Sequence, residues 1–291
     1  MTRASLGAER AAILAKLLLA CPERLPGALR DRAAAQAFRR DPGASTVHSS
    51  VGPLRLANRG DILQLEEVLV AQEYARRGFV PRSGWTVLDV GANLGFFSAW
   101  ARSLMRSGRI VAVEPVPANY HLLRLNLAAG PAGPQAMGTS SGVEVVCLNA
   151  AVAATAGELE FVVPAQNSGA ARAVSSGARD VAFLDLAGAA RITVPSRPLD
   201  ALLAEQPGTS GSPIDFPIDL MKVDVEGFEA ECFTGAPSTL ARTRRVIFEF
   251  HSQALLEECS RLLRAARLRQ VILHRNPTNP EQGTSFWRPI S

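Results

Sequence analysis

Residues 87–97 read V-L-D-V-G-A-N-L-G-F-F, and this stretch decides the fold. An apolar run containing Asp89 passes through two glycines and continues with apolar residues at helical spacing. This pattern predicts a buried strand, a tight turn and the start of a helix. Gly91 can adopt a positive φ without steric cost, and Gly95 allows the helix backbone to approach a ligand closely. The stretch is therefore typical of a nucleotide-binding turn.

A carboxylate follows the next strand of the pattern. A second apolar run, residues 110–113, ends in Glu114, which lies nineteen residues after Gly95. A carboxylate at this position can accept hydrogen bonds from both ribose hydroxyls of an adenosine. From these two motifs we predict cofactor-binding roles for Asp89, Gly91, Asn93, Gly95 and Glu114.

The nicotinamide dinucleotide fold shares this arrangement, but it requires G-x-G-x-x-G because a pyrophosphate lies against the helix N-terminus. Asn93 stands at the second glycine position and Phe96 at the third. This bulk favours a cofactor without phosphates, for which S-adenosylmethionine is the leading candidate. Asp89 supports that choice, because a carboxylate attracts the ammonium and sulfonium of this cofactor and repels a phosphate. The alternatives are an NAD(P)-dependent oxidoreductase and a non-catalytic protein that binds S-adenosylmethionine.

Length and composition indicate a soluble globular protein with one catalytic domain and an N-terminal extension. The chain has 291 residues, of which 47% are hydrophobic and 20% charged, as is usual for such proteins. We predict a helical and hairpin cap over residues 1–80 and a methyltransferase-sized α/β domain over 81–291, with a flap insertion at about 158–195. Within the cap we expect two helices, a hairpin with its turn near Gly52, and a third helix, over residues 8–20, 27–40, 47–56 and 61–75.

Cysteine usage and charge restrict the compartment and the partners. The four cysteines are widely spaced without a CxxC pair, which argues against a disulfide framework or a zinc site and favours a cytoplasmic location. The apolar run at 13–21 contains Lys16 and is too short to span a bilayer, so we expect no membrane insertion. The net charge of +4 comes from scattered arginines, which favours solvated helix faces over a nucleic-acid surface. The sequence leaves a homodimer open.

From Trp85 onward, predicted strands alternate with predicted helices. This alternation predicts a parallel sheet with helices on both faces and ligands at the carboxyl ends of the strands. Asn149 and Ala150 follow the strand predicted over 143–148, and we expect both at the cofactor site, with Asn149 on the adenine edge or simply forming a turn. Residues 164–180 are rich in Ala, Ser and Gly, which predicts a mobile flap at the substrate pocket, with Asn167 and Ser168 as contacts.

A second group of ionisable residues lies in the stretch I-D-L-M-K-V-D-V-E-G, residues 218–227. Alternate residues of a strand share a face, so we expect Lys222, Asp224 and Glu226 to point the same way. Buried charges must be paired or functional. A structural ion pair between Lys222 and Asp224 and a functional role for Lys222 both remain open. His251 follows the strand predicted over 246–250, at the expected ligand-binding edge.

Five motifs recur along the catalytic region: L-D-V-G-A-N-L-G at 88–95, V-E-P at 113–115, N-A-A at 149–151, K-V-D-V-E-G-F-E at 222–229 and F-E-F-H at 248–251. Together they resemble the FkbM-type S-adenosylmethionine-dependent methyltransferases, over roughly residues 70–290. The resemblance implies a class I, Rossmann-like methyltransferase fold with seven mostly parallel strands, the last one antiparallel. It also implies methyl transfer to a hydroxyl, commonly on a sugar or a secondary metabolite such as a glycoside or polyketide.

Methyl transfer from a sulfonium is an in-line displacement, and an alcohol acceptor must also lose a proton. Positioning supplies much of the acceleration, and a general base adds to it. Glu226 and His251 are the candidate bases. Asp224 is expected to bind the ammonium of the cofactor or to orient the acceptor, and Lys222 completes the candidate catalytic set. No cluster with metal-ligand spacing is visible in the sequence, so no metal is predicted.

Overall fold

The computed structural model describes residues 25–41, 43–128, 142–174, 188–205 and 216–290. Three of the sequence predictions therefore lie wholly or partly outside the described residues: the helix at 8–20, the end of the flap beyond residue 174 and the loop at 206–213. The remaining predictions can be compared with the structure element by element.

Seven strands form the central sheet, in the order β12-β13-β11-β10-β3-β4-β5. In chain order they are β3 (Thr86–Val90), β4 (Gly108–Val113), β5 (Val143–Leu148), β10 (Leu220–Val223), β11 (Val246–Phe250), β12 (Leu268–Arg275) and β13 (Gly283–Pro289). Strand β13 runs antiparallel to its neighbours β11 and β12, and the pairs between β11 and β5 are parallel. The predicted class I methyltransferase fold is confirmed.

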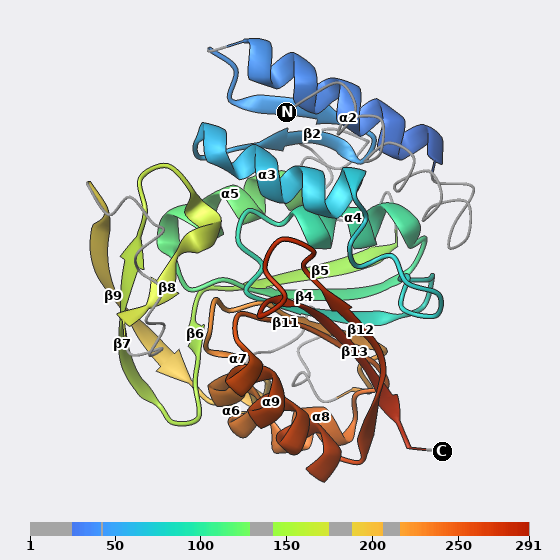
Figure 1. Ribbon diagram of the computed structural model, residues 1–291, viewed down its shortest axis with the longest axis vertical. Coiled ribbons are helices and arrows are strands. Elements are labelled where there is room, and N and C mark those ends of the chain that lie inside the picture. The colour runs from blue at the N-terminus through green and yellow to red at the C-terminus, as the bar shows by residue number, and fades with distance from the viewer. Residues whose placement is uncertain (1–24, 42, 129–141, 175–187, 206–215, 291) are drawn as a thin grey trace.

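Helices cover both faces of this sheet (Figure 1). Helices α4 (Phe96–Leu104) and α5 (Pro117–Ala128) lie on one face, and α6 (Leu199–Glu205), α7 (Glu229–Thr234), α8 (Pro237–Ala241) and α9 (Gln253–Ala265) on the other. Alternate strand residues feed two separate core layers, as the period of a strand requires. Val87 packs on the α4 side, whereas Leu88 and Val90 pack on the α9 side.

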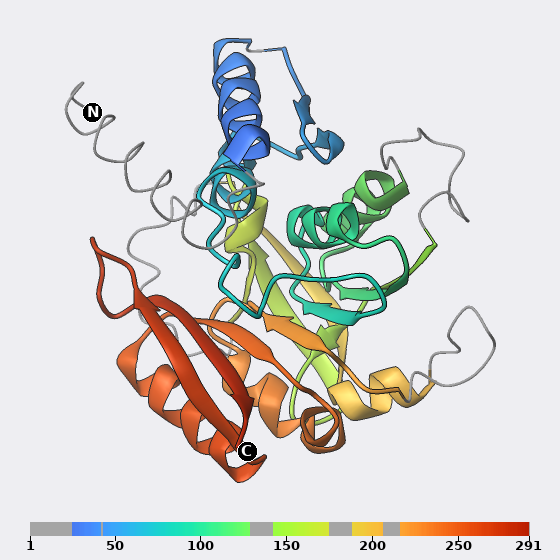
Figure 2. The same ribbon diagram turned by 90° about the vertical axis from the view of Figure 1, so that its right-hand side faces the viewer.

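The cap lies on the same side of the sheet as α4 and α5 (Figure 1, Figure 2). It consists of α2 (Leu25–Arg40), β1 (Thr46–Ser49), β2 (Gly52–Arg55), a 3-10 turn (Arg59–Asp61), α3 (Ile62–Leu65) and a π-helical turn (Glu66–Val70). The predicted helix at 27–40 and the hairpin are confirmed, although the hairpin turns just before Gly52. The predicted helix at 61–75 is too long, because Gln72 adopts a left-handed backbone with φ of 51°. Cap residues such as Leu65 belong to the same core cluster as Phe97 of α4.

The described part of the predicted flap is a second sheet rather than a loop. Its strands, in the order β6-β9-β7-β8, are β6 (Ala151–Val152), β7 (Gly157–Val163), β8 (Arg172–Ala173) and β9 (Ala190–Arg197). Phe161 and Val194 form a small core of their own with Val116. The alternating pattern in β7 and β9 was correctly predicted as strand-like, but the prediction missed that these strands pair with each other. No helix within the described ranges combines the length and the apolar character needed to cross a bilayer.

One buried carboxylate joins the cap to this second sheet. Asp61 is fully buried and its Oδ2 accepts hydrogen bonds from the backbone N–H groups of Ala57 and Asn58, each at 2.8 Å. Its Oδ1 accepts from the backbone N–H of Ser168 at 3.0 Å and from the Ser168 hydroxyl at 2.8 Å. A charged acceptor makes each of these bonds stronger than a neutral one. Asp61 therefore fixes Ser168, and with it the described part of the insertion, against the cap.

The substitution Asp61→Ala is expected to lower the free energy of unfolding by about 2–3 kcal/mol, because it leaves buried donors without an acceptor. Urea denaturation followed by circular dichroism measures this change. The Asp61→Asn variant keeps one acceptor oxygen and should lose less. A loss for Asp61→Ala within about 0.5 kcal/mol, the range of an ordinary surface substitution, would contradict this role.

Candidate active site

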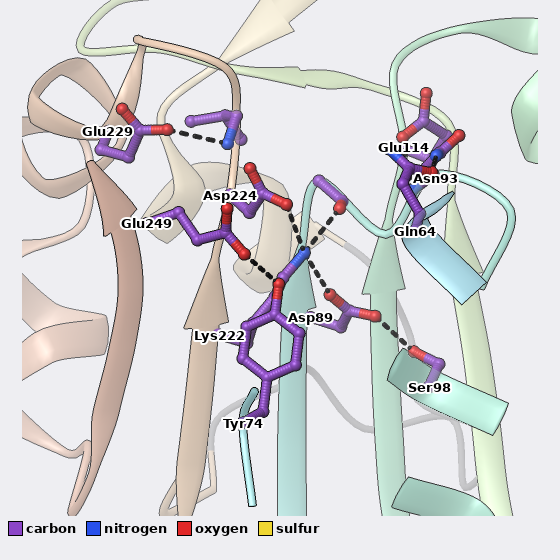
Figure 3. A network of polar contacts seen from close by, with 12 residues as sticks. Gln64, Tyr74, Asp89, Asn93, Ser98, Glu114, Lys222, Asp224, Glu229 and Glu249 are labelled. Atoms are coloured by element: carbon purple, nitrogen blue, oxygen red, sulfur yellow. Dashed lines mark hydrogen bonds and ion pairs between the residues drawn. The ribbon is translucent and has the colours of Figure 1, made fainter. Parts of the chain in front are cut away.

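A single ammonium group lies behind the glycine turn. Lys222 Nζ donates to the backbone carbonyl of Gly91 at 2.9 Å and lies 3.4 Å from both Asp89 Oδ1 and Asp224 Oδ2. Figure 3 shows these three contacts meeting at the Lys222 nitrogen. The register of the sheet makes them possible, because Lys222 pairs with Asp89 across the parallel strands β10 and β3. Ser98 of α4 completes the group by donating to Asp89 Oδ2 at 2.7 Å.

The charges in this group depend on one another because they are buried. The side chains of Lys222 and Asp89 are 5% and 0% exposed. Burial by itself would lower the pKa of Lys222, but the carboxylates of Asp224 and Asp89 raise it well above its ordinary value, so the ammonium stays charged. Both readings of Lys222 from the sequence thus meet in one residue: it forms the ion pair with Asp224, and it also holds the turn.

The turn itself has the strained backbone that its glycines predict. Gly91 and Gly95 have φ values of 75° and 84°, and Asn93 lies in the left-handed region at 48°. A Cβ on Gly91 would lie 1.7 Å from the carbonyl oxygen of Asp224, so only glycine lets the turn approach the end of β10. Gly95 serves a different purpose, since a Cβ there would lie 2.6 Å from Leu123 Cδ1 on α5. Its small size allows helix packing.

Glu114 directly follows β4 and faces the turn. Its Oε2 accepts from the backbone N–H of Asn93 at 2.8 Å, and its Oε1 from that of Val116 at 3.0 Å. Burial raises the pKa of Glu114 to about 7, although both backbone donors act to lower it. Each carboxylate oxygen has two acceptor positions, so Oε2 keeps one for a ligand hydroxyl. The residue is placed where the sequence predicted it.

The turn and Glu114 border a cavity of about 580 Å³, a size typical of small-molecule sites. Of the residues predicted from the sequence, these line it: Gly91, Asn93, Glu114, Ala150, Asp224 and Glu226. Further lining residues are apolar, namely Val90, Val113, Ala151, Val152, Phe161, Ala171, Val225 and Phe228, together with Pro115. The cavity therefore has a polar side near the turn and an apolar side toward the second sheet.

Three predicted residues lie close to this cavity without lining it. Asp89 and Lys222 support the turn from behind, as described above. Asn149 is exposed, and its Nδ2 donates to the carbonyl oxygens of Glu114 and Pro115 at 2.8 and 2.9 Å. This is the turn-forming role that the sequence left open as the ordinary alternative.

The predicted strand at 218–227 ends earlier than expected, and this changes the position of Glu226. Strand β10 ends at Val223, and Glu226 and Gly227 both adopt left-handed backbone, with φ of 53° and 97°. The alternation argument that placed Lys222, Asp224 and Glu226 on one strand face is therefore wrong for Glu226. The loop nevertheless turns Glu226 into the wall of the cavity. Burial raises the pKa of Glu226 to about 7, although His251 acts to lower it.

A second cavity, of about 650 Å³, lies on the other side of His251. Its lining includes Glu67, Glu73, Glu249, His251, His274 and Asn276. Glu249 of β11 accepts a short hydrogen bond from the hydroxyl of Tyr74 in the cap. Tyr74 was expected to be a packing residue, and it does pack edge-on against Phe97. It therefore both packs in the core and ties the cap to β11.

Between the two cavities, the structure brings together Asp224, Glu229 and His251. His251 Nε2 lies 4.0 Å from Asp224 Oδ1 and 3.7 Å from Glu229 Oε1. Glu229 begins α7, and its Oε1 accepts from the backbone N–H groups of Val225 and Gly227. Sequence reasoning picked out Asp224 and His251 but not Glu229. Its neighbours in the chain gave no signal, because the contact with His251 joins residues twenty-two positions apart.

Sequence reasoning also missed the contribution of the cap to the cofactor cavity. Gln64 of α3 lines the cavity and accepts a short hydrogen bond from Asn93 Nδ2. Ser168, which was predicted as a contact, also lines it and donates to Asn93 Oδ1 at 3.2 Å. The cap and the insertion thus meet over the turn. Gln64 carries no local pattern that marks it, because its partner is twenty-nine residues away.

Comparison with known proteins gives a family match over most of this region. The profile of the methyltransferase FkbM domain matches residues 89–276. Methyltransferase sdnD of Sordaria araneosa is 32% identical over 163 residues, which cover 51% of this chain and 59% of that protein. A segment of 62 residues is 40% identical to the AMB antimetabolite synthetase AmbE of Pseudomonas aeruginosa, covering 21% of this chain and 3% of that protein. The match thus spans little more than half of the fungal protein and a small part of the bacterial one.

Among solved structures, fibrillarin of Aeropyrum pernix with bound S-adenosyl-L-methionine aligns over 84% of this chain and 83% of its own. The alignment has 10% sequence identity and a TM-score of 0.44. Precorrin-6y C5,15-methyltransferase of Geobacter metallireducens aligns over 71% of this chain and 81% of its own, with 14% identity and a TM-score of 0.38.

The substitution Lys222→Met is expected to lower the free energy of unfolding by about 3–5 kcal/mol, because it leaves buried Asp89 without its cation. Chemical denaturation of the purified variant measures this loss. The double variant Lys222→Met with Asp89→Asn removes both charges and should recover part of it. Equal stability of wild type, single variant and double variant would show that the ammonium does not hold the site.

Proposed function

Because the chain belongs to the FkbM methyltransferase family, we propose that it transfers the methyl group of S-adenosylmethionine to a hydroxyl oxygen of a small molecule. One observation carries this proposal: the glycine turn, Glu114, Asp224 and Glu226 all line one cavity. A cofactor site and ionisable groups able to act on an acceptor therefore adjoin each other. We infer that the acceptor is a sugar or a secondary metabolite such as a glycoside or polyketide.

The residues of the cavity fit S-adenosylmethionine, the cofactor of this family. Glu114 keeps an acceptor position for the ribose hydroxyls. The apolar side, which includes Val113 and Phe161, suits an adenine ring. Asn93 is held by Gln64 and Ser168, so its side chain occupies the turn at the position where a dinucleotide fold requires glycine. This favours the methyltransferase over the NAD(P)-dependent alternative.

The protein's contribution to the reaction is positioning and proton removal. The bound cofactor supplies an electrophilic methyl group on a positively charged sulfur. Glu226, which the left-handed loop turns into the cavity wall, accepts the proton of the acceptor hydroxyl in this proposal. Asp224 orients that acceptor, because its Oδ1 lies toward His251 while its Oδ2 pairs with Lys222. The acceptor reaches this point from the second cavity, which His251 lines.

We place the protein in a reducing, cytoplasmic setting as part of the same proposal. The three cysteines within the described ranges, Cys147, Cys232 and Cys259, are free thiols, which supports this choice. A homodimer and the absence of nucleic-acid or membrane partners stay predictions from the sequence.

A ligand comparison tests the proposal directly. S-adenosylhomocysteine is expected to raise the melting temperature of the protein, because a ligand that binds the folded state stabilises it, whereas NAD should not. Transfer of a labelled methyl group to a panel of glycosides and polyketides then identifies the acceptor. Stabilisation by NAD instead would contradict the cofactor assignment. Binding of the homocysteine product without transfer to any nucleophile would favour the non-catalytic alternative.

Cofactor affinity should depend on pH through Glu114. The pKa of Glu114 in the free protein is about 7, and the ionised carboxylate is the better acceptor for ribose hydroxyls. The affinity for S-adenosylhomocysteine is therefore expected to fall about tenfold between about pH 8 and about pH 6, as the carboxylate takes up its proton. Isothermal titration calorimetry at both pH values measures this. Glu114→Gln, which cannot titrate, should bind more weakly with a flat profile, and an unchanged profile in this variant would rule out Glu114 as the cause.

The variant Glu226→Gln is expected to lower kcat by about 10²- to 10⁴-fold, the usual contribution of a general base. Its affinity for S-adenosylhomocysteine should stay close to that of the wild type. Glu231→Gln, an exposed position on α7, is the matched control and should keep normal turnover. Single-turnover kinetics with an identified acceptor measures the effect. Wild-type turnover in Glu226→Gln would transfer the role to His251 or leave positioning alone.

A further inference from the structure

Three side chains from separate elements converge where β10 and β11 end. Asp224 follows β10, Glu229 begins α7 and His251 follows β11. One oxygen or nitrogen atom from each lies within 4.8 Å of the others. The group joins two carboxylates with an imidazole, so it is a mixed donor set rather than an acidic cluster.

These donor atoms lack partners of their own. Asp224 Oδ1, Glu229 Oε2 and His251 Nε2 are each buried as atoms and form no hydrogen bond. The Glu229 side chain is 0% exposed. Leaving a buried polar atom unsatisfied is costly, so such atoms call for an explanation, and an ion is one of the usual ones. Three of them facing a common point make a bound ligand the simplest explanation.

The separations fit a shared cation better than direct hydrogen bonds. His251 Nε2 lies 3.7 Å from Glu229 Oε1 and 4.0 Å from Asp224 Oδ1, and both distances exceed the length of a hydrogen bond. A cation that binds its ligands at about 2.1 Å can separate two of them by up to about 4.2 Å. The observed spacing lies within this limit. Tetrahedral zinc would place its ligands closer, at about 3.4 Å.

The surrounding contacts hold the donors in place. Glu229 Oε1 is fixed by the backbone N–H groups of Val225 and Gly227, at 3.0 and 3.3 Å. Lys222 contacts the other oxygen of Asp224, Oδ2, at 3.4 Å and leaves Oδ1 available. Hydrogen bonds of this kind orient metal ligands in known sites. The donor set is thus pre-arranged without the cation.

We propose that Asp224, Glu229 and His251 bind one divalent cation of the Mn²⁺ type. Carboxylate oxygens suit Mg²⁺ and Mn²⁺, and an imidazole nitrogen moves the preference toward Mn²⁺. Three protein ligands leave coordination positions open. Because Asp224 lines the cofactor cavity and His251 lines the second one, these positions lie between the two. That an acceptor hydroxyl takes one of them rests on the proposed methyltransferase function, whereas binding of the cation does not.

Titration of Mn²⁺ into the full chain, freed of metal by dialysis against a chelator, tests the site without any acceptor. The electron paramagnetic resonance signal of free Mn²⁺ should disappear until one equivalent has been bound. Electron spin-echo modulation should then show one directly bound imidazole nitrogen. Glu229→Gln and His251→Gln are expected to weaken binding at least about 100-fold, and His251→Gln should also remove the nitrogen modulation.

The variant Glu67→Gln is the matched control, since it removes a carboxylate from the neighbouring cavity but not from the cluster. Its Mn²⁺ affinity should stay within about twofold of the wild type, and the folding of each variant is checked by circular dichroism. The spin-echo measurement on the wild type decides the question if a variant does not fold. No saturable binding, or binding without a nitrogen ligand, would overturn the proposed site. Methyl transfer in the presence of chelator would then still support the enzyme, whereas Mn²⁺ binding without methyl transfer would support the site alone.

Discussion

The site is organised by one constraint, a buried ammonium that must keep its partners. Lys222 cannot lose contact with Asp89 and Asp224 without leaving charges stranded in the core. Its bond to the Gly91 carbonyl ties the same ammonium to the turn. The turn, the end of β10 and the register between β3 and β10 are therefore set together. A protein that kept the sheet but lost this contact would have no fixed geometry at the place where its strands end.

Much of this could be predicted from the sequence because it depends on local pattern. The strand, turn and helix around Gly91, the carboxylate of Glu114 and the sheet with its antiparallel last strand all follow from periodicity and short motifs. What escaped prediction depends on contacts between distant segments. Alternation along a strand could not reveal that β10 ends at Val223, because the left-handed backbone at Glu226 becomes necessary only when the chain leaves the sheet. Likewise, no spacing rule pairs Glu229 with His251.

The cap and the insertion show how a common catalytic core acquires its own specificity. Both are additions to the seven-stranded sheet, and both reach the turn through side chains that contact Asn93. Asp61 links them to each other. Loops and additions of this kind vary more freely than a sheet core. The residues that choose the acceptor are thus carried by parts of the chain whose changes leave the central strands intact.

The scarcity of lysine gives this site an unusual chemical property. The chain has 29 arginines but only Lys16 and Lys222 as lysines, and Lys222 is the one lysine within the described ranges, with 5% of its side chain exposed. Reagents that acylate amines need an uncharged, accessible nitrogen, and Lys222 offers neither while its ion pairs persist. Acylation of Lys222 would therefore follow the rate at which this region opens, and a single peptide in a mass spectrum would report the local breathing of the catalytic centre.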